Sequence, residues 1–158
     1  MEGYESVRIE ADPKIGVLLE GRGIRVEDIQ KVIAFAEVAE NFFTNSSTGH
    51  SLACRRPSKT TYWVEYGREG DFYRIYSAYS HRMKILEEFN MPAKLKKTTD
   101  WFCNKCGVPL ELATVKLSYL DETFAADTPA CPSCQRVCVS EEDAVEKMAL
   151  AEKMLEDK

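Results

Sequence analysis

The sequence predicts an α+β protein in two parts: a domain of one helix and a three-stranded antiparallel sheet, followed by a small four-cysteine ribbon with a C-terminal helix. Three observations predict this fold class. Apolar residues recur at helical spacing over residues 27–43, hydrophobicity then alternates along three segments, and two Cys-x-x-Cys pairs follow in the second half of the chain. We expect residues 1–90 to form the first domain, 91–100 a basic linker and 101–158 the ribbon.

The clearest element of the first domain is an amphipathic helix. It begins near Glu27 and should end at the turn residues of 45–49. A short helix or a strand is expected before it, over residues 15–20, and should end at Gly21-Arg22-Gly23. The apolar residues that define the buried face of the longer helix are Ile29, Val32, Ile33, Ala36, Ala39 and Phe43.

Three strands are expected after the helix, at 51–55, 60–66 and 71–79, where the hydrophobic period changes to two. Both faces of the last two strands carry aromatic residues. We interpret these rings as core and cross-strand pairs, and the alternative is that one face binds a partner protein. The aromatic residues are Tyr62, Trp63, Tyr66, Phe72, Tyr73, Tyr76 and Tyr79.

Charge and apolar runs exclude several classes of partner. The chain carries a net charge of −5, and residues 100–158 contain six basic and 12 acidic side chains, so the ribbon should repel nucleic acid. The three lysines of the expected linker are too few for a polybasic membrane signal. No apolar run reaches the ~20 residues that span a bilayer, and the acidic N-terminus does not resemble a secretory signal. We therefore expect a cytoplasmic protein that binds neither nucleic acid nor membrane.

The two cysteine pairs predict a metal site. Cys103-Asn104-Lys105-Cys106 and Cys131-Pro132-Ser133-Cys134 are separated by 24 residues, enough for a β-hairpin that brings the second pair to the first. Two residues between paired cysteines allow one tight turn to aim both sulfurs at a common point. We expect Cys103, Cys106, Cys131 and Cys134 to hold zinc in a zinc ribbon, with iron as the alternative metal. Two disulfides are the competing interpretation, which a reducing cytoplasm disfavours.

The rest of the ribbon should contain a hairpin, a short strand and a terminal helix. The hairpin follows from the alternation over 115–119 and the turn at 120–123, and the short strand from 136–139. Ser140 can cap a helix that carries a narrow apolar seam. We expect this seam to dock on the body of the protein, with self-association into a homodimer as the alternative. Its residues are Ala144, Met148, Ala151 and Leu155.

The cysteine pairs resemble those of rubredoxins in Cys103-x-x-Cys106-Gly107 and in Cys131-Pro132-x-Cys134. Two positions depart from that pattern: Gln135 replaces a glycine, and Val108 stands where rubredoxins have an aromatic residue. The segment from Trp101 to Lys158 is also similar to a family of small bacterial putative redox proteins. The matching parts are Cys103 to Leu110, Ser118-Tyr119-Leu120, Cys131 to Cys134 and the helix from Glu141 to Leu155. That resemblance implies a rubredoxin-like ribbon and an association with molybdenum-containing hydroxylases, and it brings no established reaction.

Few other residues suggest chemistry. Cys138 is interpreted as a buried apolar residue, with a spare thiol or an alternate ligand as alternatives. Cys54 follows His50 by four residues, and with His81 elsewhere a Cys/His nucleophilic site is conceivable, although sequence cannot show a shared cleft. No phosphate loop, nucleophile elbow or metalloprotease motif occurs.

These observations assign no catalytic residue and predict a binding function. We expect a metal-binding accessory or adaptor protein, most simply with zinc, that contacts a partner protein such as an oxidoreductase. The alternative is an electron-transfer protein with iron in the same site. Thiol–disulfide exchange at Cys131 and Cys134 is a weaker third interpretation, because four ligands together would favour metal.

Overall fold

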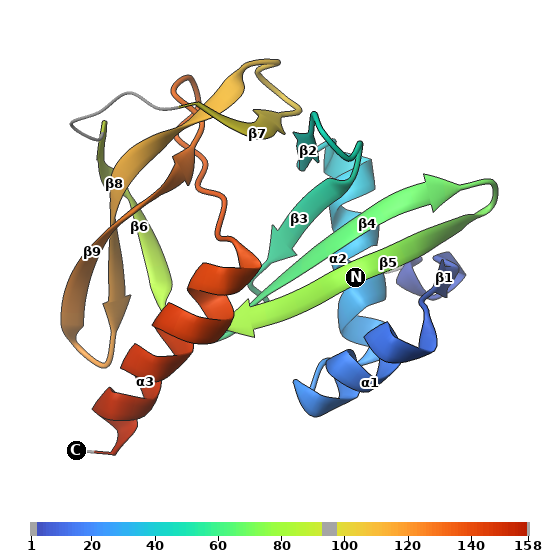
Figure 1. The fold of residues 1–158 in the computed structure, drawn as a ribbon, viewed down its shortest axis with the longest axis horizontal. Coiled ribbons are helices and arrows are strands. Elements are labelled where there is room, and N and C mark those ends of the chain that lie inside the picture. The colour runs from blue at the N-terminus through green and yellow to red at the C-terminus, as the bar shows by residue number, and fades with distance from the viewer. Residues whose placement is uncertain (1–2, 93–97, 158) are drawn as a thin grey trace.

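The computed structural model describes residues 3–92 and 98–157. Its dominant feature is one curled, mixed sheet of nine strands. The two N-terminal helices lie outside the curl, and the C-terminal helix lies between the two ends of the sheet (Figure 1). This overturns the expected fold class of a three-stranded sheet followed by a small separate ribbon. The strand order is β1-β5-β4-β3-β2-β7-β8-β6, with β9 paired to β8. Only the β1–β5 pair is parallel among the described strand pairs.

The strands fall into two groups that meet at β2 and β7. The strands of the first group are β1 (Ile9–Glu10), β2 (Phe43–Asn45), β3 (Ser51–Arg55), β4 (Thr61–Glu69) and β5 (Phe72–His81). The second group contains β6 (Lys84–Pro92), β7 (Thr98–Cys103), β8 (Pro109–Tyr119) and β9 (Glu122–Ala130).

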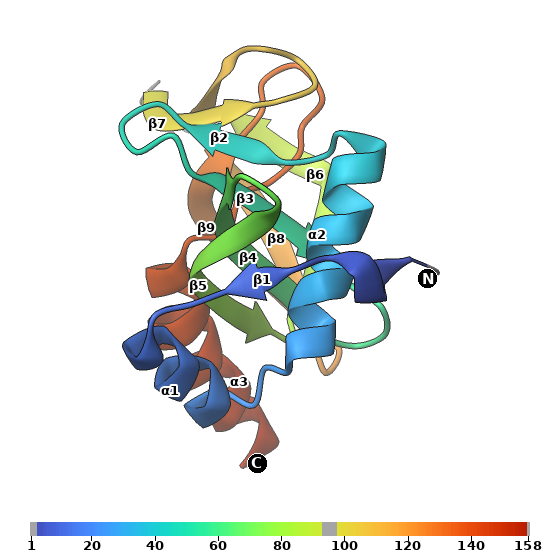
Figure 2. The same ribbon diagram turned by 90° about the vertical axis from the view of Figure 1, so that its right-hand side faces the viewer.

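Within the described residues three α-helices accompany the sheet, and α2 and α3 lie on opposite sides of β3–β5 (Figure 2). A 3₁₀ turn (Tyr4–Ser6) precedes β1, and a π-helical segment (Asp143–Met148) runs directly into α3. The helix bounds are α1 (Pro13–Gly21), α2 (Val26–Ala39) and α3 (Ala149–Glu156). No helix in the described ranges has the length and apolar content needed to cross a bilayer.

The individual elements show where the prediction failed. The meander β3–β4–β5 and the helix at α1 match the expected positions, but α2 ends at Ala39 instead of continuing to Phe43. Glu40 adopts a left-handed conformation with φ 53°, which ends the helix and turns the chain into β2. Phe43 then pairs with both Leu52 and Cys103, so it extends the first meander into the cysteine ribbon.

The predicted elements of the second half of the chain also differ from the structure. β6 falls partly where a linker was expected, and it pairs with β8. The short strand expected at 136–139 is reduced to one bridge between Ala130 and Val137. The division of the chain at residues 90 and 101 stays a prediction, and residues 93–97 of the expected linker lie outside the described residues.

Two hydrophobic cores lie on opposite faces of the β3–β5 meander. The α2 core joins α2 to one face of the meander and contains Leu19, Ile24, Ile29, Val32, Ile33, Ala36, Ala53, Val64, Tyr66, Ile75 and Ala78. The cysteine-side core joins the other face to the second strand group and the C-terminal helix, and its larger members are Phe43, Leu52, Trp63, Tyr79, Met83, Leu110, Val115, Leu117, Val139 and Met148.

The C-terminal helix docks on the protein's own body, as expected. Ala144 and Met148 are buried, and Ala151 packs against the cysteine-side core. A buried carboxylate adds to this docking: Glu152 accepts the backbone N–H groups of Arg82 and Met83 at 2.8 and 2.9 Å. The predicted cap is also present, because the Ser140 hydroxyl oxygen accepts the N–H of Asp143 at 3.1 Å.

Candidate metal centre

Each Cys-x-x-Cys pair forms a tight turn at the end of a strand. In the first, Gly107 donates its N–H to the carbonyl of Cys103 at 2.8 Å, and in the second Gln135 donates to Cys131 at the same distance. Gly107 and Gln135 both have left-handed backbone conformations, with φ 66° and 65°. The two turns therefore share one geometry, and Gln135 adopts the conformation that normally favours glycine.

The two turns bring the four predicted sulfurs together. The Sγ atoms of Cys103, Cys106, Cys131 and Cys134 all lie within 4.8 Å of one another. The Sγ atoms of Cys103 and Cys134 are 3.8 Å apart. Tetrahedral thiolate sites with metal–sulfur bonds of about 2.3 Å require sulfur–sulfur distances of about 3.8 Å. These residues therefore fit a four-thiolate metal ion, and the cluster could hold one.

The four thiols differ in their surroundings. Cys103 and Cys131 are buried, Cys106 is half-buried and Cys134 is exposed at the edge of the cluster. Partial desolvation of the sulfur, together with the neighbouring thiols of the other three cysteines, raises the pKa of the Cys134 thiol to about 12, against the opposing effect of the Arg136 N–H. Burial likewise raises the pKa of Cys103, whereas a hydrogen bond from the Ser133 hydroxyl lowers that of Cys106. A metal ion must displace protons from the thiols with raised pKa values, so binding should weaken as pH falls.

The first cysteine turn is fastened to the helical part of the molecule. The strand that leads into it, β7, pairs with β2, and Cys103 lies opposite Phe43. Asn104 donates its backbone N–H to the carbonyl of Phe42 at 3.0 Å and its side-chain amide to the carbonyl of Glu40 at 3.1 Å. The cysteine cluster is therefore connected directly to the C-terminal end of α2. In the sequence Asn104 is only a spacer between two cysteines, and no local pattern predicts this contact.

The remaining candidates have contacts of their own. Cys138 is buried in the cysteine-side core, and burial raises the pKa of its thiol far above the ordinary value. His50 Nδ1 lies 2.6 Å from a Glu65 oxygen, and its ring stacks on Tyr76 at 3.6 Å. Cys54 is half-buried and packs against the cysteine-side core. His50 and Cys138 are therefore each held by contacts within the sheet and the core.

His81 is a buried structural group. The indole N–H of Trp63 donates to His81 Nε2 at 2.9 Å, and His81 Nδ1 donates to the carbonyl of Met83 at 2.9 Å. Burial lowers the pKa of His81 to about 4, so the ring is neutral near pH 7. A neutral ring is required here, because Nε2 must accept the hydrogen bond from Trp63.

The aromatic faces of the sheet belong largely to the cores. Trp63, Tyr66 and Tyr79 are each buried. Phe43, Trp63 and Tyr79 form a stacked row in the cysteine-side core, with successive ring centroids 6.4 Å apart. Tyr79 also donates its hydroxyl to the carbonyl of Val139 at 2.6 Å. This supports the interpretation of these rings as core and leaves them unavailable for contact with a partner.

Comparison with known families gives a match for the C-terminal part of the chain. Residues 99–158 match a domain of unknown function (DUF7479). The matched segment contains both cysteine pairs and the C-terminal helix. Comparisons with curated proteins and with solved structures give no match.

Proposed function

We propose that this protein is a zinc-binding accessory protein without catalytic activity of its own, in which the four-cysteine site fixes the C-terminal region for binding to a partner protein. The observation that carries the proposal is the convergence of four Sγ atoms within 4.8 Å. Zinc in such a set of four thiolates has no redox chemistry and no open position for a substrate. A structural role follows from that chemistry.

The surroundings of the cysteines support a structural role. Cys103 and Cys131 contribute their side chains to the cysteine-side core, next to the apolar residues of β8 and the C-terminal helix. Asn104 ties the same cluster to the end of α2. Holding the four sulfurs together would therefore hold β7, β9 and the end of α2 in one arrangement.

The outer face of α3 is the proposed contact for the partner. Leu150 and Met154 lie one helical turn apart, and 61% and 63% of their surfaces are exposed. The choice of a redox enzyme as the partner rests on the resemblance of residues 101–158 to the bacterial proteins described above. Leu150→Glu with Met154→Glu should abolish binding to such an enzyme, whereas Val17→Glu, on the exposed surface of α1, should not. Equal binding by all variants would remove α3 from the proposal.

A second candidate function is electron transfer with iron in the same site. The exposure of Cys134 and the partial exposure of Cys106 favour it, because they leave one edge of the cluster open to a redox partner. Iron in a four-sulfur site is a one-electron carrier, and its absorption bands bleach on reduction.

Metal content separates the two functions. The protein should be purified without oxygen and without added metal, and its metal content and visible spectrum recorded together. One zinc per chain and no colour would support the accessory function. One iron per chain with reversible bleaching would support electron transfer, and a chain with two disulfides and no metal would contradict both.

A further inference from the structure

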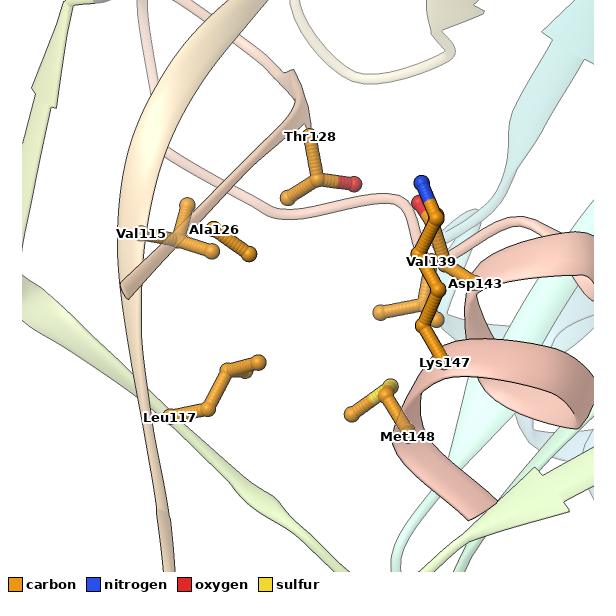
Figure 3. Close-up of a pocket in the computed structure, with 8 residues that line it drawn as sticks. All are labelled: Val115, Leu117, Ala126, Thr128, Val139, Asp143, Lys147 and Met148. Carbon is orange, nitrogen blue, oxygen red and sulfur yellow. The ribbon is translucent and has the colours of Figure 1, made fainter. Parts of the chain in front are cut away.

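We propose that the space between the β8–β9 hairpin and the π-helical segment is a binding site for a small, uncharged, apolar molecule. The side chains of β8 and β9 face those of the helix across this space (Figure 3). It adjoins the cysteine-side core, is partly open to solvent and lies apart from the four sulfurs. The residues that line it are Val115, Leu117, Ala126, Thr128, Val139, Asp143, Lys147 and Met148.

The chemistry of the lining selects an apolar occupant. Val115, Leu117 and Met148 present hydrocarbon and thioether surface to the space. The hydroxyl of Thr128 is engaged elsewhere, because it donates to the carbonyl of Cys138 at 2.9 Å. Asp143 and Lys147 also line the space, but almost all of the surface that faces it is apolar. The space therefore offers water few polar partners and favours an apolar molecule.

The volume sets the size of the occupant. The cavity measures about 50 Å³. A water-sized group requires about 10–15 Å³ by the same measure, so the space takes roughly four such groups. An occupant of the size of isobutane or a xenon atom would fit, and a drug-sized ligand would not.

The backbone beside the cavity carries an independent signal. Asp143, Lys147 and Met148 all lie in the π-helical segment, and Ala149 donates its N–H to the carbonyl of Ala144, five residues earlier. This pattern replaces the ordinary helical bond to the fourth residue. π-Helical turns are rare and occur frequently at functional sites. The irregular turn coincides here with the wall of the cavity.

The cavity is already partly open, and its mouth can widen at low cost. Lys147 Nζ lies 3.3 Å from the carboxylate of Asp143, and 72% of the lysine side chain is exposed. Exposed ion pairs of this kind contribute little to stability. Ala126 is exposed on the opposite side of the mouth. A small molecule can therefore enter between Lys147 and β9 without unfolding of the core.

The test uses methyl NMR spectra of the whole, metal-loaded chain, titrated with dissolved xenon and, separately, with isobutane. The methyl signals of Val115, Leu117, Val139 and Met148 should shift together and saturate. Ala126→Leu should weaken binding at least tenfold by filling the mouth. Ala125→Leu is the matched control. Residue 125 is next to Ala126 on β9, so its side chain points to the other face of the strand, and this variant should bind the probes as tightly as the unmodified chain does.

Each other outcome overturns the proposal. If the methyl signals of the unmodified chain do not move, the space is a packing defect and binds neither probe. Shifts that persist in Ala126→Leu place the probe elsewhere. Loss of binding in both variants shows that the effect is not confined to the cavity. Both substitutions lie at exposed positions, and an amide spectrum of each variant checks that it folds.

Discussion

The two cores of this molecule are built by different means. The α2 core contains mainly aliphatic residues from α2 and one face of the meander, together with Tyr66. The cysteine-side core combines an aromatic row, two metal-ligand candidates and two long-range hydrogen bonds, one accepted by Glu152 and one donated by Tyr79. Apolar burial alone can hold the first core, whereas the second depends on groups that must be brought together in a specific geometry. The two should therefore respond differently to the same perturbation.

Removal of the metal should have the largest effect, and it should be confined to one core. Chelation, or Cys103→Ser with Cys131→Ser, should release β7, the end of β9 and the last turn of α2, while the amides of the rest of α2 stay protected. Structural zinc contributes on the order of 10 kcal/mol in small domains. Hydrogen exchange measured residue by residue would test this, with Cys54→Ser as a control outside the cluster. Equal loss of protection in both regions would contradict the comparison.

Truncation of a side chain in the α2 core should destabilise the protein and leave the cysteine cluster unchanged. Ile33 is fully buried, so Ile33→Ala should reduce the free energy of unfolding by about 4 kcal/mol through lost burial and a cavity. Val38 lies on the same helix with 87% of its surface exposed, and Val38→Ala should change stability by less than about 0.5 kcal/mol. Urea denaturation measures both values. Zinc affinity should be unchanged in each variant. A large fall in the zinc affinity of Ile33→Ala would show that the two cores do not respond independently.

The cysteine-side core should also be the acid-sensitive one. Burial lowers the pKa of His81 to about 4, from 6.5 for the unfolded chain. The unfolded state therefore binds a proton that the folded state does not, and stability is lost as pH falls from about 6.5 to about 4. The loss should reach about 3 kcal/mol. His81→Gln retains an acceptor for Trp63 and should flatten this part of the pH profile of unfolding. An unchanged profile would show that His81 titrates normally.

The contact between the two regions should give the smallest effect. Asn104→Ala removes the hydrogen bond to the carbonyl of Glu40 and should cost about 1 kcal/mol. Zinc affinity should fall several-fold, because the first cysteine turn loses its support. Lys105→Ala, in the same turn and also exposed, is the control. Competition titration with a chromogenic chelator measures both zinc affinities. Equal affinities would show that Asn104 does not support the first cysteine turn.

The cysteine cluster was the part most accessible from sequence, because its information is local. Two Cys-x-x-Cys spacings encode two tight turns, and the hairpin between them limits how the turns can meet. The meander β3–β5 was accessible for the same reason, since alternating side chains report directly on strand faces. The Ser140 cap likewise depends on residues three positions apart.

The larger sheet could not be predicted, because it depends on pairings between distant segments. Phe43 fits the apolar face of a helix by spacing, yet its backbone pairs with Leu52 and Cys103. In β9, the residues Glu122–Ala130 have a weak strand pattern, and pairing with β8 along their whole length determines their conformation. Glu152 reads as one more charge on an exposed helix, and only the docked structure shows it accepting backbone N–H groups.

Zinc held by Cys103, Cys106, Cys131 and Cys134 as a structural element can be tested by X-ray absorption at the zinc edge, on protein purified without added metal. We expect about one zinc per chain, bound by four sulfur atoms at about 2.3 Å and by no nitrogen or oxygen. A zinc ion with histidine or water among its ligands, or an absorption edge from iron in place of zinc, would contradict it.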